Sequence, residues 1–237
     1  MIEISIVLPA FNEGMMIQHS LQMIENKFKA MKLDYEIIVV DDGSVDDTLL
    51  KANKYEGKSV TVYHYKKNRG KGFAVRYGMT RAVGRYKMFM DVDLSTSLDA
   101  VELFLKTMRA GGHDVIIGDR RSKSSRFLQP WHRRVLGQGF VVLSQCCVGG
   151  HINDFTCGFK MFNRGSVEAL FKRQRIFGWA FDTELMGIAM LHGLRIAQLP
   201  VAWKDHQPSH VRSLRAVFSV LVDLIKIKWN LCRGRYG

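Results

Sequence analysis

Tyr86-Lys87-Met88-Phe89-Met90-Asp91-Val92-Asp93 (residues 86–93) is the stretch that decides the fold. It predicts a short, largely apolar strand that ends in two aspartates separated by one residue. Strands that are apolar throughout favour a parallel sheet covered by helices, and such sheets bind ligands at the carboxyl ends of their strands. Asp91 and Asp93 would lie at that edge, where paired carboxylates supply the hard oxygen ligands that Mg²⁺ and Mn²⁺ prefer.

The rest of the first half repeats this order of strand, polar turn and helix. Apolar runs rich in β-branched residues predict strands at Ile2–Leu8, Ile37–Val40, Val60–Tyr65 and Val115–Ile117. Strands that alternate with helices indicate an α/β domain with a mostly parallel sheet. Polar residues that follow these strands should gather at one edge: Asn12, Asp41, Asp42, Asp91, Asp93 and Arg120.

A glycine-bearing turn, Asn68-Arg69-Gly70-Lys71-Gly72, follows the third strand. Its backbone N–H groups and its lysine at a helix start could cradle a phosphate. It lacks the spacing and the Lys-[Ser/Thr] pair of a Walker A loop, and it lacks the third glycine of a dinucleotide fingerprint. The sequence therefore argues against a nicotinamide dehydrogenase.

The two halves of the chain differ in charge. Residues 1–119 carry 16 Lys/Arg and 16 Asp/Glu, whereas residues 120–237 carry 19 and 6 and account for the whole formal charge of +13. Such asymmetry favours an anionic partner: nucleic acid, an anionic membrane or phosphate. The basic residues form no recognition helix, zinc finger or RNP motif, so we expect no nucleic-acid partner. The four cysteines form no CxxC pair, which favours reduced thiols.

Four motifs, in this order, resemble the family 2 glycosyltransferases of GT-A fold: Val7–Glu13, Val39–Ser44, Asn68–Gly72 and the pair Asp91/Asp93. The second half resembles the polyprenyl-phosphate branch of that family, most closely the dolichyl-phosphate β-glucosyltransferases. The matching stretches are Gly118–Arg120, Arg133-Arg134, Asp154–Lys160, Trp179–Leu185 and Val201–Arg212. The resemblance spans nearly the whole chain and implies a Rossmann-like, mostly parallel sheet flanked by helices.

The resemblance also implies the partners and the residues that bind them. A nucleotide-diphosphate sugar would be bound by Pro9, Ala10, Phe11, Asn12, Glu13, Asp41, Asp42, Gly43, Lys71 and Asp91. Asp91 and Asp93 would hold Mg²⁺ or Mn²⁺ on its diphosphate. The phosphate of the acceptor would face Arg120, Arg133, Arg134, Ser209, His210 and Arg212. The related mannose synthases often have Gln where this chain has Ser95.

The implied reaction is transfer of a hexose, with inversion, to a polyprenyl or dolichyl phosphate by a metal-dependent hexosyltransferase. The glucose and mannose branches share these motifs, and the closer resemblance of the second half to the glucosyl branch favours UDP-glucose as the donor. The second pKa of a phosphate is about 6, so this acceptor is largely ionised at pH 7 and needs a general base less than a hydroxyl does. Asp93, Arg120 and Asp182 are the candidate catalytic residues. Asp182 or Glu184 would be the base for a hydroxyl acceptor; alternatively, both form salt bridges or cap a helix.

Two other functions stay open, besides a degenerate, non-catalytic relative, against which the intact Asp91/Asp93 pair argues. A family 2 transferase that acts on a sugar hydroxyl, in polysaccharide or glycolipid synthesis, would share the whole donor half. A basic nucleic-acid-binding protein would fit a pI near 9.7, but the acidic edge of the sheet would repel a phosphate backbone. Acceptor assays separate the first alternative from lipid-phosphate transfer, and salt-dependent binding to duplex DNA identifies the second.

Residues 213–237 predict a basic amphipathic helix after a catalytic domain at 1–212, which divides into a nucleotide-sugar half (1–119) and an acceptor half (120–212). Its apolar positions are 214, 217, 218, 221, 224, 225 and 229, with Arg215, Ser219, Asp223, Lys226, Asn230 and Arg233 opposite. Such a helix suits a membrane interface, or it packs on the domain. With no signal peptide and no spanning segment, we expect a cytoplasmic protein, peripheral on the cytoplasmic face of an anionic membrane.

Overall fold

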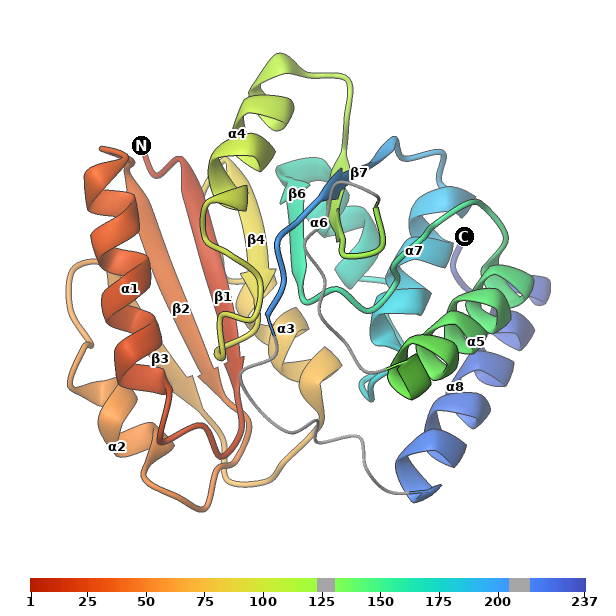
Figure 1. Cartoon of the computed structure of the whole chain (residues 1–237), viewed down its shortest axis with the longest axis horizontal. Helices are drawn as coiled ribbons and strands as arrows, with labels where there is room; N and C mark the ends of the chain where they lie inside the picture. Colours follow the sequence, from red (N-terminus) through yellow and green to blue (C-terminus); the bar gives the residue numbers. More distant parts are fainter. Residues whose placement is uncertain (123–130, 205–213) are drawn as a thin grey trace.

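The computed structural model describes residues 1–122, 131–204 and 214–237, and the side chains of residues 131–136 and 214–217 also lie outside this description. The described residues form one seven-stranded sheet with helices on both faces (Figure 1). The predicted α/β architecture is therefore confirmed.

The strands lie in the order β3-β2-β1-β4-β6-β5-β7. Their bounds are β1 Ile4–Ala10, β2 Tyr35–Asp41, β3 Val60–His64, β4 Tyr86–Met90, β5 Val115–Asp119, β6 Phe159–Asn163 and β7 Ile196–Pro200. Strand β6 runs antiparallel to its neighbours β4 and β5, and the other pairs are parallel. Because β6 separates β4 from β5, its reversal leaves those two strands pointing the same way. One edge of the sheet thus collects the carboxyl ends of six strands and the start of β6.

Two buried clusters, one on each face, hold the helices to the sheet. Helices α1 (Ile17–Ala30), α2 (Thr48–Asn53) and α4 (Ala100–Ala110) pack on one face. Helices α3 (Lys71–Met79), α6 (Arg164–Phe171) and α7 (Phe181–Leu191) pack on the other. Successive side chains of a strand point to opposite faces, so Ile6 and Leu8 of β1 join the first cluster and Val7 joins the second.

Two helices of the second half lie beside α7, outside the helices that cover the sheet (Figure 1). They are α5 (Trp131–Val148) and α8 (Leu214–Cys232). Beyond α8, the Tyr236 side chain is fully buried in the cluster that contains α7. Among the residues described, no helix combines the length and the apolar character needed to cross a membrane.

The way α8 packs corrects one expectation. The face against the domain carries Asp223, Leu224, Ile227 and Asn230, all buried. Phe218, Leu221, Ile225 and Trp229, predicted to share the apolar face with Leu224, are instead exposed. Two positions of the predicted polar face are buried because hydrogen bonds satisfy them: Asp223 accepts from Lys226, and Asn230 donates to the Tyr236 hydroxyl.

Other boundaries differ little from expectation. Strand β4 has the predicted bounds, whereas β1 begins and ends two residues later than predicted. Helix α6 was not predicted, because eight residues are too few to show a clear helical period. Asn163 caps it by accepting a hydrogen bond from the Ser166 N–H.

Candidate active site

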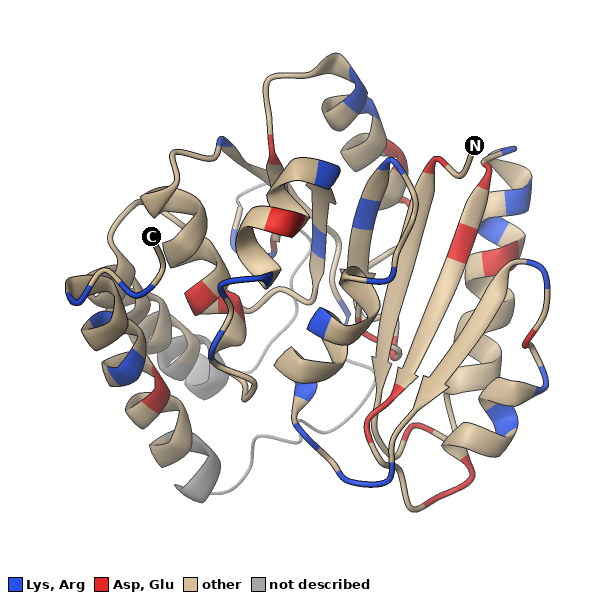
Figure 2. Ribbon diagram, turned by 180° about the vertical axis from the view of Figure 1, so that it is seen from behind, with Lys and Arg blue, Asp and Glu red and all other residues tan. Residues whose placement is uncertain are grey.

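The loops that follow β1, β2 and β4 form an acidic edge. Ala10 pairs with Asp41 at the ends of β1 and β2, and Asp91 follows the last residue of β4. Figure 2 shows acidic residues clustered at these strand ends and basic residues in the loop before α3. The site therefore brings opposite charges together at the edge that the sequence predicts.

The first predicted donor motif is tied to the loop after β2. Asn12 has a φ of +56°, and its Oδ1 accepts a hydrogen bond from the Val45 N–H at 3.0 Å. The Asn12 N–H donates to the Ser44 hydroxyl at 2.9 Å, and the Glu13 N–H donates to Thr48 Oγ1 at 2.8 Å. Asn12 thus shapes the loop. Of the flanking predictions, Pro9 and Ala10 lie within β1, whereas the Phe11 side chain is exposed at the edge.

The two aspartates that end and follow β2 have different partners. Asp41 accepts a hydrogen bond from the Ser44 hydroxyl, and burial raises its pKa. Asp42 accepts from the Arg69 N–H at 2.8 Å and the Gly70 N–H at 2.9 Å, so it holds the turn before α3. Gly43, with a φ of +73°, is needed there because a Cβ would lie 2.7 Å from the Asn68 nitrogen. Asp42 and Gly43 position the loop.

Both aspartates of the Asp91/Asp93 pair also have polar partners. Lys71 Nζ lies 2.5 Å from Asp91 Oδ1. Asp93 accepts from the Ser95 N–H at 2.9 Å and the Ser95 hydroxyl at 2.8 Å. Ser95 therefore orients the second aspartate.

The carboxylates at this edge fit a divalent metal ion that arrives with a diphosphate. Burial raises the pKa of Glu13 to about 7, and the neighbouring carboxylates of Asp93 and Asp91 add to this rise. Within the described part of the chain, no three His, Cys, Asp or Glu residues are grouped as a metal site. Mg²⁺, however, is usually bound through one or two carboxylates together with substrate phosphates and water. Asp91 and Asp93 supply that number.

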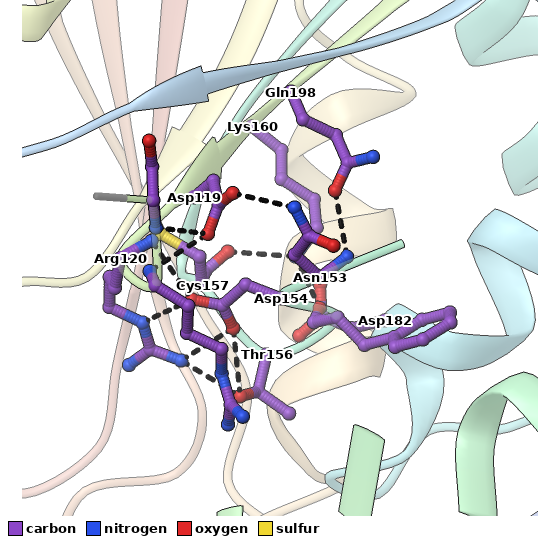
Figure 3. Close-up of polar contacts among 12 residues, drawn as sticks. Asp119, Arg120, Asn153, Asp154, Thr156, Cys157, Lys160, Asp182 and Gln198 are labelled. Carbon is purple, nitrogen blue, oxygen red and sulfur yellow. Dashed lines mark hydrogen bonds and ion pairs between the residues drawn. The ribbon is translucent and has the colours of Figure 1, made fainter. Parts of the chain in front are cut away.

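Arg120, predicted to face the acceptor phosphate, is held by a buried carboxylate (Figure 3). Its Nε and NH2 groups donate to the two oxygens of Asp154 at 2.6 and 2.8 Å, and NH2 also donates to Thr156 Oγ1 at 2.9 Å. Burial alone would raise the pKa of Asp154, but Arg120 lowers it below its ordinary value. Within the described residues, NH1 is left without a hydrogen bond and remains able to donate to an anion.

Asp182, a predicted catalytic residue, pairs with a buried lysine. Lys160 Nζ donates to Asp182 Oδ1 at 2.5 Å and to the Phe155 and Cys157 carbonyls at 2.8 and 2.7 Å (Figure 3). All three ammonium protons therefore have acceptors. The ion pair connects α7 to β6, and the two carbonyl contacts add the segment that precedes β6, which favours the structural alternative for Asp182.

Glu184, the second possible base, forms hydrogen bonds that hold the loop before α7. Its carboxylate accepts from the Ile176 N–H at 2.8 Å, the Arg175 N–H at 3.0 Å and the Tyr236 hydroxyl at 2.6 Å. Burial raises the pKa of Glu184 to about 7. A fully buried carboxyl with these partners supports the fold around α7 and α8.

The remaining acceptor predictions are not described. The side chains of Arg133 and Arg134, and all of Ser209, His210 and Arg212, lie outside the described residues. The chain does approach the site before that segment: the Lys204 N–H donates to the Ser95 carbonyl at 2.8 Å, beside the Asp91/Asp93 pair.

Three residues that organise the site were not predicted as functional. Lys160 lies in the apolar run Phe159–Asn163, and a lysine in such a run was the available signal of a buried ion pair. Gly158 is required because a Cβ there would lie 2.1 Å from Asp91 Oδ2. Tyr236 carried no signal, because its partner lies 52 residues away in the sequence.

Comparison with known proteins identifies one family and relatives that match most of the chain. The model of the family described as Glycosyl transferase family 2 matches residues 5–171. A dolichyl-phosphate beta-glucosyltransferase of Drosophila melanogaster is 34% identical over 220 residues, which cover 86% of this chain and 68% of that protein. The Homo sapiens protein of the same name is 32% identical over 251 residues, covering 99% and 77%.

Solved structures resemble the fold. Glucosyl-3-phosphoglycerate synthase of Mycobacterium tuberculosis, in complex with Mn²⁺, UDP-glucose and phosphoglyceric acid, superposes with a TM-score of 0.70 at 19% identity and covers 95% of this chain and 79% of its own. Mannosyl-3-phosphoglycerate synthase of Rubrobacter xylanophilus gives a TM-score of 0.70 at 18% identity, covering 99% and 75%. These similarities confirm the predicted mostly parallel sheet with flanking helices.

Proposed function

Since the chain belongs to glycosyl transferase family 2, we propose that it transfers glucose from UDP-glucose, with inversion, to a polyprenyl or dolichyl phosphate. Membership confirms the resemblance seen in the four motifs. Relatives named dolichyl-phosphate beta-glucosyltransferase match across nearly the whole chain, including the acceptor half, and this observation carries the choice of substrates.

The donor edge supports binding of a nucleotide diphosphate. Lys71 at the start of α3 offers an ammonium to phosphate oxygens, and the exposed Phe11 ring offers an apolar surface to a base. Asp91 and Asp93 would hold Mg²⁺ or Mn²⁺ on the diphosphate. Bound there, the ion would offset the negative charge that develops on the departing diphosphate.

The acceptor half supports a phosphate rather than a hydroxyl. Transfer to a hydroxyl needs a general base, and both candidates are buried and paired: Asp182 with Lys160, and Glu184 with Tyr236. An ionised phosphate needs only cationic positioning, for which Arg120 retains its NH1 group. Asp154 fixes the plane of the guanidinium, so this group is held in one orientation.

The exposed side of α8 supports a peripheral position on the cytoplasmic face of an anionic membrane. Phe218, Leu221, Ile225 and Trp229 follow one another at helical spacing, and three of the four are at least half exposed. Lys226 and Lys228 lie beside this row, and the Arg233 guanidinium stacks 4.5 Å from the Trp229 ring centroid. The single carboxylate of α8, Asp223, is buried against the domain. An apolar row flanked by cations suits an anionic lipid surface.

A transfer assay tests this function. Radiolabelled UDP-glucose, and GDP-mannose in parallel, are offered with a short polyprenyl phosphate in the presence of Mn²⁺, Mg²⁺ or EDTA. We expect an acid-labile lipid product from UDP-glucose that EDTA abolishes. No lipid product from either donor, despite normal UDP binding, would overturn the acceptor assignment and favour transfer to a sugar hydroxyl.

A further inference from the structure

Lys71 Nζ lies 2.5 Å from Oδ1 of Asp91, a carboxylate that would hold the metal ion. We propose that Lys71 acts as an internal counter-cation that neutralises Asp91 until a nucleotide diphosphate enters, so that the divalent ion and the nucleotide bind cooperatively. This inference rests on the proposed donor site, and it adds that binding of the metal ion and binding of the nucleotide at that site are thermodynamically coupled.

The first argument is the geometry of Asp91. Its Oδ1 contacts Lys71 Nζ at 2.5 Å, and its backbone N–H donates to the Gly158 carbonyl at 3.2 Å. Its other oxygen packs against Gly158, where a Cβ would lie 2.1 Å from Oδ2. The carboxylate is thus confined between the lysine and a glycine backbone. A metal ion that binds Asp91 must share it with the ammonium or displace the ammonium.

The second argument is that backbone contacts hold the turn that carries Lys71, whereas its ammonium is held by the Asp91 carboxylate, a contact that a phosphate oxygen could replace. The Gly72 N–H donates to the Phe177 carbonyl at 2.9 Å, and Gly70, with a φ of +95°, packs so closely that a Cβ would lie 2.5 Å from that oxygen. The Lys71 ammonium lies 5.5 Å from the Trp179 ring centroid. The turn therefore stays in place while the four-carbon side chain can swing toward an incoming phosphate.

The third argument is electrostatic. A lysine ammonium is ordinarily charged at neutral pH, and that of Lys71 forms an ion pair with Asp91. Without nucleotide, a divalent ion at Asp91 would meet a fixed positive charge a few ångströms away, which opposes its binding. A bound diphosphate would remove this conflict, because its negative charge would attract both the Lys71 ammonium and the divalent ion. Each ligand then raises the affinity for the other by the same factor.

Binding of Mn²⁺ alone, measured by calorimetry or by the electron paramagnetic resonance of free Mn²⁺, tests the proposal on the whole chain without any transfer. We expect wild-type protein to bind Mn²⁺ weakly, and UDP to tighten this binding at least about tenfold. Lys71→Met should bind Mn²⁺ alone about five- to tenfold more tightly, and UDP should enhance it by a correspondingly smaller factor. Lys66→Met, which removes an exposed lysine of the neighbouring loop, should match wild type.

Two further variants distinguish the loss of the Lys71 charge from misfolding of the protein. Lys71→Gln repeats the loss of charge with a polar side chain, and Lys71→Arg keeps the charge and should retain weak binding of Mn²⁺ alone. Mn²⁺ affinity in Lys71→Met and Lys71→Gln that equals or falls below that of wild type would overturn the proposal. This failure is distinct from failure of the proposed function, because UDP-linked Mn²⁺ binding without any lipid product would reject the acceptor and leave the linkage intact.

Discussion

The two halves of the site use their carboxylates in opposite ways. At the proposed donor edge, Asp91 and Asp93 are partly open to solvent, and Lys71 forms an ion pair with Asp91. In the proposed acceptor half, Asp154 and Asp182 are buried against Arg120 and Lys160 in ion pairs within the fold. The first arrangement leaves the carboxylates accessible to ligands. In the second, the carboxylates form ion pairs that hold loops in place. Residue type alone does not separate the two.

The largest expected effect comes from breaking the buried pair of the acceptor half. Asp154→Ala leaves the Arg120 guanidinium with no carboxylate, and loss of one partner of a buried pair costs about 3–5 kcal/mol. Urea unfolding measures this loss. Glu168→Ala, which breaks an exposed pair with Lys172, should change the unfolding free energy by less than about 1 kcal/mol.

A double variant sharpens this result. Arg120→Leu with Asp154→Leu removes both charges, so it should be more stable than Asp154→Ala alone. An Asp154→Ala protein as stable as wild type would show that the pair is not buried in solution and would remove the contrast between the halves.

A pH dependence is expected from Glu184. Burial raises its folded-state pKa from 4.5 to about 7, so the folded protein binds the proton more tightly than the unfolded chain does. This contribution to stability is fully present below pH 4.5 and is lost as pH rises toward and through 7, by on the order of 3 kcal/mol. The difference between the wild-type and Glu184→Gln unfolding free energies across pH 4–8 isolates it. Glu168→Gln, at an exposed glutamate, is the matched control for the substitution.

Arg120→Lys tests the acceptor role with the charge retained. Lysine keeps a cation beside Asp154 but loses the planar fork and the NH1 group, so transfer to a polyprenyl phosphate should fall about 100-fold. Binding of UDP with Mn²⁺ should stay within about twofold of wild type, since the donor edge is untouched. Arg195→Lys, at an exposed ion pair with Asp114, is the matched control. Normal transfer by Arg120→Lys would reject Arg120 as an acceptor residue.

A smaller effect on activity is expected at Asp182. If the acceptor is a phosphate, Asp182→Asn should keep transfer within about threefold of wild type while lowering stability by about 3–5 kcal/mol, because the buried Lys160 ammonium loses its counter-charge. The same chemical change at Asp93 should abolish most transfer. A folded Asp182→Asn protein that loses activity as Asp93→Asn does would identify Asp182 as a base and favour a hydroxyl acceptor.

The sequence predicted the donor half well because its signals are local. A short apolar strand followed by Asp91 and Asp93 determines both the strand and the edge that its aspartates reach. The partners of Asp154, Asp182 and Glu184 lie 34, 22 and 52 residues away, so no periodicity or spacing could reveal them. The orientation of α8 was unpredictable for a related reason: Asp223 and Asn230 look like a solvent face until their buried hydrogen bonds are known.

The smallest expected effect concerns the exposed row of α8. Ile225 is 68% exposed, so its replacement by serine should leave folding unchanged and remove one apolar contact with lipid. Partial insertion of such a side chain contributes about 1 kcal/mol, which predicts roughly fivefold weaker co-sedimentation with anionic vesicles. Val83→Ser, an equally exposed apolar position in the loop before β4, is the control and should bind vesicles as wild type does. Raising the salt concentration should weaken both proteins, because Lys226 and Lys228 contribute through screened attraction. Equal vesicle binding by Ile225→Ser and wild type would remove α8 as the lipid-facing surface and return it to a purely packing role.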